Sequence, residues 1–118
     1  MVKKLQFDYY DEDEFTEFLD SLPVADAASF ARLIQRVEEI GITTSAKADW
    51  IAPIHGKKYQ GLFELRSKHG SNIQRALYFH KIGNHYLITN CFTKKSQKTP
   101  TKELNKALNR KKIYENNS

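Results

Sequence analysis

The sequence has few of the residues that cross-link small proteins, bind metals or anchor a chain in a membrane. Its single cysteine, Cys91, excludes an internal disulfide, and its four histidines lack the spacing of zinc ligands. No apolar run reaches the roughly 18 residues of a membrane span. No apolar segment follows the two lysines near the N-terminus, so we expect no signal peptide. A glycine-rich phosphate loop is also missing. We therefore predict a cytoplasmic protein that uses no metal and no cofactor.

What the sequence does contain is enough apolar material for one core. Of its 118 residues, 40% are hydrophobic and 12% are aromatic, and such a composition argues against disorder. This length is typical of one domain. We therefore predict a single domain spanning residues 1–118, without internal repeats.

Charge is divided unevenly between the two halves of the chain. Residues 1–55 carry five Lys and Arg against eleven Asp and Glu, whereas residues 56–118 carry fourteen against three. In the second half, basic residues alternate with apolar ones, as in the segments 62–66 and 75–79. This alternation would place cations on a folded sheet. The sequence thus predicts a rigid site for a polyanion, with nucleic acid as the first candidate.

The first half predicts a strand and then two helices that form an antiparallel hairpin. Residues 3–9 alternate in the manner of a strand. Asp11 is expected to cap the first helix, with Glu14 in capping-box register. The second helix should begin after Pro23 and end before Gly41, which suits the position just past a helix. The apolar faces should contain Leu5, Phe7 and Tyr9 in the strand, Phe15, Phe18, Leu19 and Leu22 in the first helix, and Ala27, Phe30, Ile34, Val37 and Ile40 in the second.

The second half predicts three strands and a final helix. The strands cover residues 62–67, 73–80 and 85–92, and the links 69–72 and 81–84 have the composition of hairpin turns. Residues 42–61 are less regular and predict a loop or a short edge strand. A basic helix should begin at Thr99 and Pro100, with Thr99 as its cap. Its apolar stripe would contain Leu104, Ala107, Leu108 and Tyr114.

This order of elements predicts an α+β fold. The N-terminal strand and helix pair should pack on an antiparallel sheet of about four strands, followed by a C-terminal basic helix. The helix pair would cover one face of the sheet. We expect the other face to be left partly open and basic.

Three stretches of the second half carry a family signature. They are residues 61–66 (GLFELR), 72–79 (NIQRALYF) and 91–100 (CFTKKSQKTP), the last followed by the basic helix. They resemble the RelE/ParE toxin superfamily, and most closely its HigB-like, phage-derived branch. The acidic first half matches that family in the order of its elements.

The resemblance implies a RelE-like fold and the toxin of a type II toxin–antitoxin pair. RelE-like toxins cut messenger RNA in the ribosomal A site without metal, by attack of a ribose 2′-hydroxyl on the adjacent phosphate. HigB-like toxins are held inactive by a helix-turn-helix antitoxin, so the expected partners are a HigA-like antitoxin, the ribosome and messenger RNA. A heterotetramer with the antitoxin is expected, reaching operator DNA only through the antitoxin.

Positive side chains from separate strands suit this chemistry. Fixed cations stabilise the charge of a pentacoordinate phosphate, and the planar guanidinium of arginine binds two oxygens at once. If the strands pair around the short turn, Arg66 and Arg75 lie side by side, within reach of Lys94 and Lys95. The resemblance implies that Arg66 and Arg75 hold the phosphate and that Lys94 or Lys95 donates a proton to the leaving group.

The sequence does not identify the general base, because it differs from RelE at two positions of the site. Glu64 stands where RelE has a lysine, and residues 99–101 replace its tyrosine. Glu64 and His69 are both candidates for the base. The residues that we expect to contact RNA or the ribosome are Lys57, Lys58, Tyr59, Lys98, Lys102, Lys106, Arg110, Lys111 and Lys112.

Several other interpretations fit the same residues. Each of these cations is also compatible with an ordinary solvated or ion-paired side chain, and Glu64 and Arg66 with a structural pair. A ParE-like protein of this fold would block DNA gyrase without catalysis, and a plain nucleic-acid-binding module would not be toxic. The antitoxin could cover the basic cleft or contact the acidic segment Asp8–Asp26.

Overall fold

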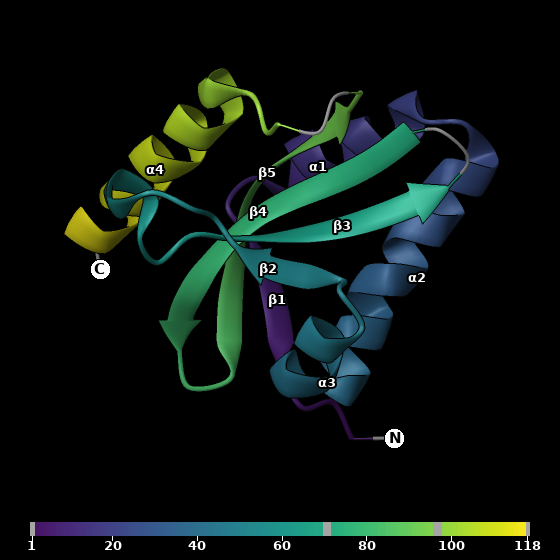
Figure 1. Cartoon of the computed structure of the whole chain (residues 1–118), viewed down its shortest axis with the longest axis horizontal. Helices are drawn as coiled ribbons and strands as arrows, with labels where there is room; N and C mark the ends of the chain where they lie inside the picture. The colour runs from purple at the N-terminus through teal and green to yellow at the C-terminus, as the bar shows by residue number, and fades with distance from the viewer. Residues whose placement is uncertain (1, 70–71, 96–97, 118) are drawn as a thin grey trace.

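A computed structural model describes residues 2–69, 72–95 and 98–117 (Figure 1). The α+β fold class is confirmed. In chain order the elements are β1 (Gln6–Tyr9), α1 (Glu12–Ser21), α2 (Val24–Ile40), α3 (Ile42–Lys47), β2 (Ile51–Pro53), a 3-10 turn η1 (Lys57–Tyr59), β3 (Phe63–His69), β4 (Asn72–Ile82), β5 (His85–Lys94) and α4 (Thr101–Asn116).

The sheet has the strand order β1-β5-β4-β3-β2. The three strands predicted in the second half form its centre as antiparallel neighbours, and β2 is the short edge strand expected near residue 51. The sheet is nevertheless not purely antiparallel, because β1 pairs with β5 in parallel. The helix pair α1–α2 follows β1 along the chain, so β1 is not joined to its neighbour by a hairpin, and nothing forces an antiparallel pairing.

One face of the sheet is covered by α1 and α2, as predicted. Phe30, Ile34 and Val37 of α2 pack with Phe7 and Leu65 of the sheet in one buried cluster. Asp11 caps α1 as predicted, since its Oδ1 accepts a hydrogen bond of 3.0 Å from the N–H of Glu14.

Gly41 ends α2, as the sequence indicates. Its φ of 89° lies in the left-handed region, which a residue with a Cβ rarely adopts. The chain then turns at once into α3, a six-residue helix that the irregular sequence pattern did not predict.

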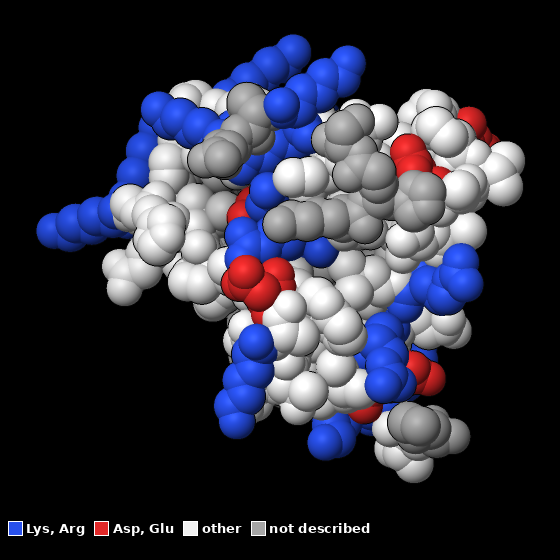
Figure 2. Space-filling model, turned by 45° about the vertical axis from the view of Figure 1, so that its right-hand side comes forward, with Lys and Arg blue, Asp and Glu red and all other residues white. Residues whose placement is uncertain are grey.

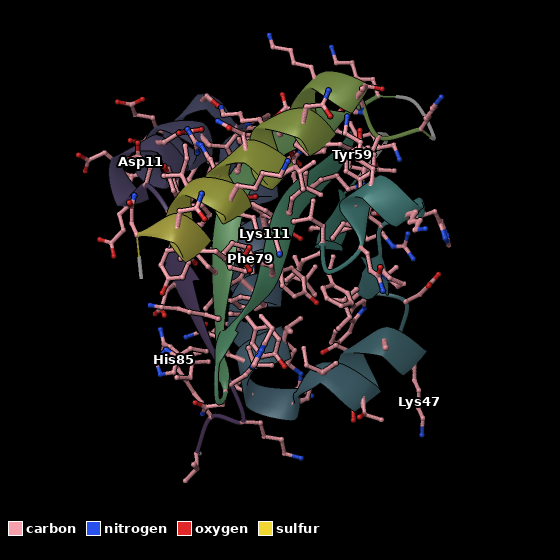
Figure 3. All side chains as sticks on the ribbon, turned by 90° about the vertical axis from the view of Figure 1, so that its left-hand side faces the viewer. Asp11, Lys47, Tyr59, Phe79, His85 and Lys111 are labelled. Carbon is pink, nitrogen blue, oxygen red and sulfur yellow. The ribbon has the colours of Figure 1, made fainter. Side chains whose placement is uncertain are left out.

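The opposite face is only partly covered, and the part left open is basic, as we expected. α4 lies across it, and Ala107 packs fully buried against Leu77, Phe79 and Phe92 of the sheet. In Figure 3 this helix runs across the front of the molecule with Lys111 beside Phe79, and the ammonium of Lys111 lies 5.6 Å from the ring centroid. The apolar residues of α4, which recur at helical spacing, cover an apolar part of the sheet that would otherwise be exposed to water.

Two cations of α4 fasten it to α1. Lys106 Nζ lies 3.0 Å from Glu14 Oε1, and Arg110 Nη2 lies 2.7 Å from Glu14 Oε2. Arg110 also donates to the carbonyl of Thr89 at 2.8 Å and stacks on the ring of Tyr10. The side chain of Glu14, predicted to complete a capping box, is therefore bonded to the last helix, more than 90 residues further along the chain.

Candidate active site

Two arginines face each other across β3 and β4. In the antiparallel register Arg66 is the direct partner of Arg75, which confirms the prediction that they lie side by side. On the other side, Arg75 is opposite Phe92 of β5. Because side chains alternate along a strand, both arginines share the sheet face on which α4 packs. They lie beyond the apolar patch that α4 covers.

A buried carboxylate joins the two arginines. Glu64 is 7% exposed, and its Oε1 accepts hydrogen bonds from Arg75 Nη1 and, at 3.3 Å, from Arg66 Nη1. Its other oxygen, Oε2, accepts a bond of 3.3 Å from the hydroxyl of Thr99. Both oxygens of Glu64 are thus engaged, and the carboxylate holds the two guanidinium groups together.

Arg66 is also tied to the loop before β2. Its Nη2 lies 2.8 Å from Asp49 Oδ1, and its Nε donates to the carbonyl of Asp49 at 3.0 Å. Asp49 adopts a left-handed backbone with a φ of 66°, a conformation that aspartate tolerates better than most residues. Arg66 is therefore held from two sides while its side chain remains 22% exposed.

Lys94 and Lys95 have different environments. Lys95 follows the end of β5 and is exposed, whereas Lys94 is only 4% exposed and its Nζ donates to the Thr99 hydroxyl at 3.4 Å. Burial, followed by the nearby charges of Arg75 and Arg66, lowers the pKa of Lys94, and Glu64 partly opposes this. Of the two lysines, Lys94 is the one whose ammonium has been brought to the arginines.

Thr99 does not cap the last helix, contrary to our prediction. The residue at the cap position of α4 is Pro100, which makes no side-chain cap bond. The Thr99 hydroxyl instead links Lys94 to Glu64. The sequence signal was ambiguous, because a threonine before a proline fits a helix start as well as a polar contact inside a cleft.

These side chains form the wall of a cleft of about 380 Å³. Its cations are Arg66, Arg75, Lys94 and Lys98, and its lining also includes Ile54 and His55 from the segment after β2. Sequence reasoning did not place His55 here, since its position depends on how the irregular segment 54–62 folds over the sheet.

One buried donor in this cleft is unused. Arg75 is 5% exposed, and within the described parts of the chain its Nε has no hydrogen-bond acceptor. Buried N–H groups are nearly always bonded, so this unbonded donor, which is itself hidden from solvent, is an exception. The cations of the cleft wall make it suited to an anion such as a phosphate.

The remaining predicted residues fall into four groups. Lys58 and Tyr59 of η1 both bond Asn105 of α4, at 3.3 and 2.9 Å, and Tyr59 packs against the second cluster. Lys106, Arg110 and Lys111 make internal ion pairs. Lys57, Lys98, Lys102 and Lys112 have exposed side chains. His69 ends β3, but its side chain lies outside the described residues.

On one face of the molecule, basic residues outnumber acidic ones and gather in patches. Figure 2 shows Lys and Arg gathered at its upper left, with further blue atoms near the centre and on the right, and only small red areas between them. Among the described residues, no group of three or more His, Cys, Asp and Glu is placed to hold a metal ion. In the same part of the chain, no helix has both the length and the apolar character needed to cross a bilayer.

The region that carries this cleft matches a known family. A family model described as "Phage derived protein Gp49-like (DUF891)" covers residues 17–112, from the middle of α1 to the last turns of α4. The chain belongs to this Gp49-like family. The match includes every residue of the cleft wall named above, and it supports the resemblance to the HigB-like, phage-derived branch.

Two curated relatives point the same way. Both are named "Probable endoribonuclease HigB1" and come from Mycobacterium tuberculosis, from strains CDC 1551 / Oshkosh and ATCC 25618 / H37Rv. Each is 33% identical to this chain over 100 residues, covering 85% of this chain and 73% of the relative. The HigB-like resemblance is thereby confirmed.

Proposed function

We propose that this Gp49-like protein is the toxin of a type II toxin–antitoxin pair and acts as an endoribonuclease. In the finer form of the proposal, it cuts messenger RNA in the ribosomal A site in the cytoplasm, without a metal ion. The observation that carries the proposal is the convergence of Arg66, Arg75 and Lys94 on one cleft. The name of the mycobacterial relatives supports the same activity.

The cleft supplies charge where the reaction needs it. When a ribose 2′-hydroxyl attacks the adjacent phosphorus, a 2′-O–P bond forms, the P–O5′ bond breaks, and negative charge grows on the nonbridging oxygens. Arg75 and Arg66, which line the cleft, would hold these oxygens. Because Glu64 and Asp49 already fix the guanidinium groups, little reorganisation is needed in the transition state.

Lys94 is our choice for the general acid. Its lowered pKa makes its ammonium a stronger acid than an ordinary lysine, so it can protonate the leaving 5′-oxygen. The products are a 2′,3′-cyclic phosphate and a 5′-hydroxyl. Lys95, exposed beyond the strand, would instead meet the RNA backbone.

The 2′-hydroxyl proton needs an acceptor, and the cleft offers two described candidates. Both oxygens of Glu64 are occupied by Arg66, Arg75 and Thr99, which favours a positioning role for this carboxylate. His55 also lines the cleft and carries an imidazole, a group suited to general base catalysis. His69, predicted from the sequence, remains the third candidate.

The proposed partners follow from the same family. A HigA-like helix-turn-helix antitoxin would neutralise the toxin in a heterotetramer and carry it to operator DNA. The ribosome and messenger RNA would meet the basic surface, including Lys57, Lys98, Lys102 and Lys112. The acidic helix α1 is supported as an antitoxin contact by its charge, since Asp11, Glu12, Asp13, Glu17 and Asp20 are all exposed.

Primer extension on messages after induction of the protein tests this function. We expect cuts inside translated codons that disappear when translation is blocked. Intact transcripts during growth arrest would overturn the proposal. If DNA damage signalling accompanied those intact transcripts, a ParE-like block of gyrase would replace it.

A further inference from the structure

A second hollow lies on the other side of Arg66, outside the candidate active site. It encloses about 680 Å³ between α2 and the loop before β2. This volume falls within the roughly 300–1,000 Å³ of pockets that hold small ligands. We call it the α2 groove and define it by Arg32, Arg36, Trp50, Arg66 and Ser67.

The α2 groove is continuous with the active-site cleft through Arg66, which lines both. β2 pairs with β3 from Phe63 to Leu65, and the N–H of Arg66 then bonds the carbonyl of Trp50 at 2.9 Å. Beyond this point β2 no longer covers β3, so β3 itself forms the edge of the sheet. Arg66 lies on the active-site face and its neighbour Ser67 on the α2 face, so a strand of ligand leaving the cleft crosses this edge into the groove.

The groove wall on α2 carries two cations, Arg32 and Arg36, and one carboxylate, Glu39. Arg32 and Arg36 are one helical turn apart, which places both on the same exposed face. Arg36 has a side chain that is 54% exposed, and its pair with Glu39 is long, at 3.8 Å. Such an exposed, long ion pair contributes little free energy, so Arg36 loses little when it leaves Glu39 to bind a phosphate.

The facing wall is aromatic and polar. Trp50 is half-buried, packs on the first core cluster and lines the groove, and Ser67 of β3 adds a hydroxyl group. The carboxylate of Asp49 on this wall is already bonded to Arg66. Two cations opposite an indole fit a nucleotide better than an acidic peptide, because a nucleotide has both a phosphate to pair with arginine and a base to stack on tryptophan.

We propose that the α2 groove binds the nucleotide next to the scissile phosphate on the same RNA strand, with its base on Trp50 and its phosphate on Arg32 and Arg36. The inference rests on the proposed function, since it requires RNA in the neighbouring cleft. It adds a base-contacting subsite, whereas the cleft itself contacts only phosphate and ribose, which carry no sequence information.

Trp50 allows a direct test, because it is the only tryptophan in the chain. The probe is a single-stranded hexaribonucleotide with 2′-O-methyl groups throughout, which cannot be cleaved by 2′-hydroxyl attack. Titrated at low salt, it should change the Trp50 emission saturably. Arg32→Ala and Arg36→Ala should each weaken binding about threefold or more, and lower the slope of log K against log salt by about 0.7.

A matched control removes a cation elsewhere. Lys47 is exposed at the end of α3 and does not line the groove (Figure 3). Lys47→Ala should bind the probe as the unaltered protein does. Trp50→Phe should bind a fluorescein-labelled probe nearly normally, whereas Trp50→Leu should bind it more weakly, as loss of a stacking ring predicts.

The outcomes separate this inference from the proposed function. If Arg32→Ala, Arg36→Ala and Trp50→Leu bind the probe and cleave messages like the unaltered protein, the groove assignment is wrong while the nuclease proposal stands. If labelled probe binds without any change in Trp50 emission, or if only the antitoxin changes it, the assignment is also wrong. Lys94 lines the cleft and not the groove, so loss of cleavage in Lys94 variants bears on the nuclease proposal alone.

Discussion

The cations of the cleft and those of α4 are alike in type but differ in what surrounds them. Arg75 and Lys94 are 5% and 4% exposed and face a cleft, with one donor of Arg75 unused. Arg110 and Lys106 instead pair with a carboxylate of α1 and fasten a helix. The comparison teaches that a basic residue becomes a candidate for chemistry when the fold buries it beside other cations and leaves part of it unpaired.

Lys94→Met gives the largest expected effect. It removes the proposed general acid, so cleavage should fall by about 10² to 10⁴. For the unaltered protein, cleavage should be lost as pH rises through the lowered pKa of Lys94, because the acid must hold its proton to donate it. Pre-steady-state cleavage across pH measures both. A Lys94→Met variant with normal activity, or a profile that does not change in that variant, would remove Lys94 from the reaction.

The stability of the same variant sharpens the comparison. Folding lowers the pKa of Lys94, so the unfolded protein holds this proton more tightly than the folded protein does. The free energy of unfolding should therefore rise as the pH increases from the pKa of Lys94 in the folded protein to its pKa in the unfolded protein. Urea unfolding should show this rise for the unaltered protein and not for Lys94→Met. A matched variant is Lys95→Met, whose exposed side chain should leave stability and its pH dependence unchanged.

Arg75→Ala should be costly for both stability and activity. It leaves the Glu64 carboxylate buried with one partner fewer, which typically destabilises by about 3–5 kcal/mol, and it removes a donor to the phosphate, worth about 10² to 10³ in rate. The double variant Glu64→Gln/Arg75→Gln removes both charges and keeps a hydrogen-bonding amide at each position. It should recover most of the stability but not the cleavage. Urea unfolding and message cleavage measure the two effects, and recovered cleavage in the double variant would contradict a role for Arg75 in the reaction.

Arg110→Ala should act on stability and not on chemistry. Burial raises the pKa of Glu14, but hydrogen bonds from Arg110 and Lys106 outweigh it and lower that pKa. The ion pairs of Glu14 therefore stabilise the fold fully above the pKa that Glu14 has in the unfolded protein. This stabilisation is lost as the pH falls through the pKa of Glu14 in the folded protein. We expect a loss of about 1–2 kcal/mol near neutral pH and a smaller one in acid, by urea unfolding. Cleavage that falls despite intact folding would show that Arg110 contacts RNA.

Lys112→Ala should have the smallest effect. Its side chain is exposed on α4, so the free energy of unfolding should change by no more than about 0.5 kcal/mol. If the helix meets ribosomal RNA, binding to ribosomes should weaken slightly and its salt dependence should decrease by about one phosphate contact. Unchanged salt dependence in a ribosome-binding assay would assign Lys112 to the solvated surface.

Much of the fold could be predicted because its signals are local. Helix α2 is indicated by the apolar stripe of Phe30, Ile34 and Val37 and by Gly41 at its end. The central strands are indicated by the alternation of apolar and polar residues. Both patterns depend on neighbours within a few residues. Elements of three and six residues, β2 and α3, are too short to show a full period. The side-by-side placement of Arg66 and Arg75 was also predictable, because a hairpin couples strand register to the short turn between them.

The sequence by itself therefore determined the order of helices and strands, the apolar face of each, and which cations could meet across a hairpin. Only the tertiary structure decided that Lys94 is buried while Lys95 is not, that Thr99 bonds Glu64 instead of capping α4, and that Glu14 holds the last helix. The physical reason is range. Backbone propensity and periodicity act between neighbours in the chain, whereas burial, ion pairing and unused donors depend on packing between segments tens of residues apart.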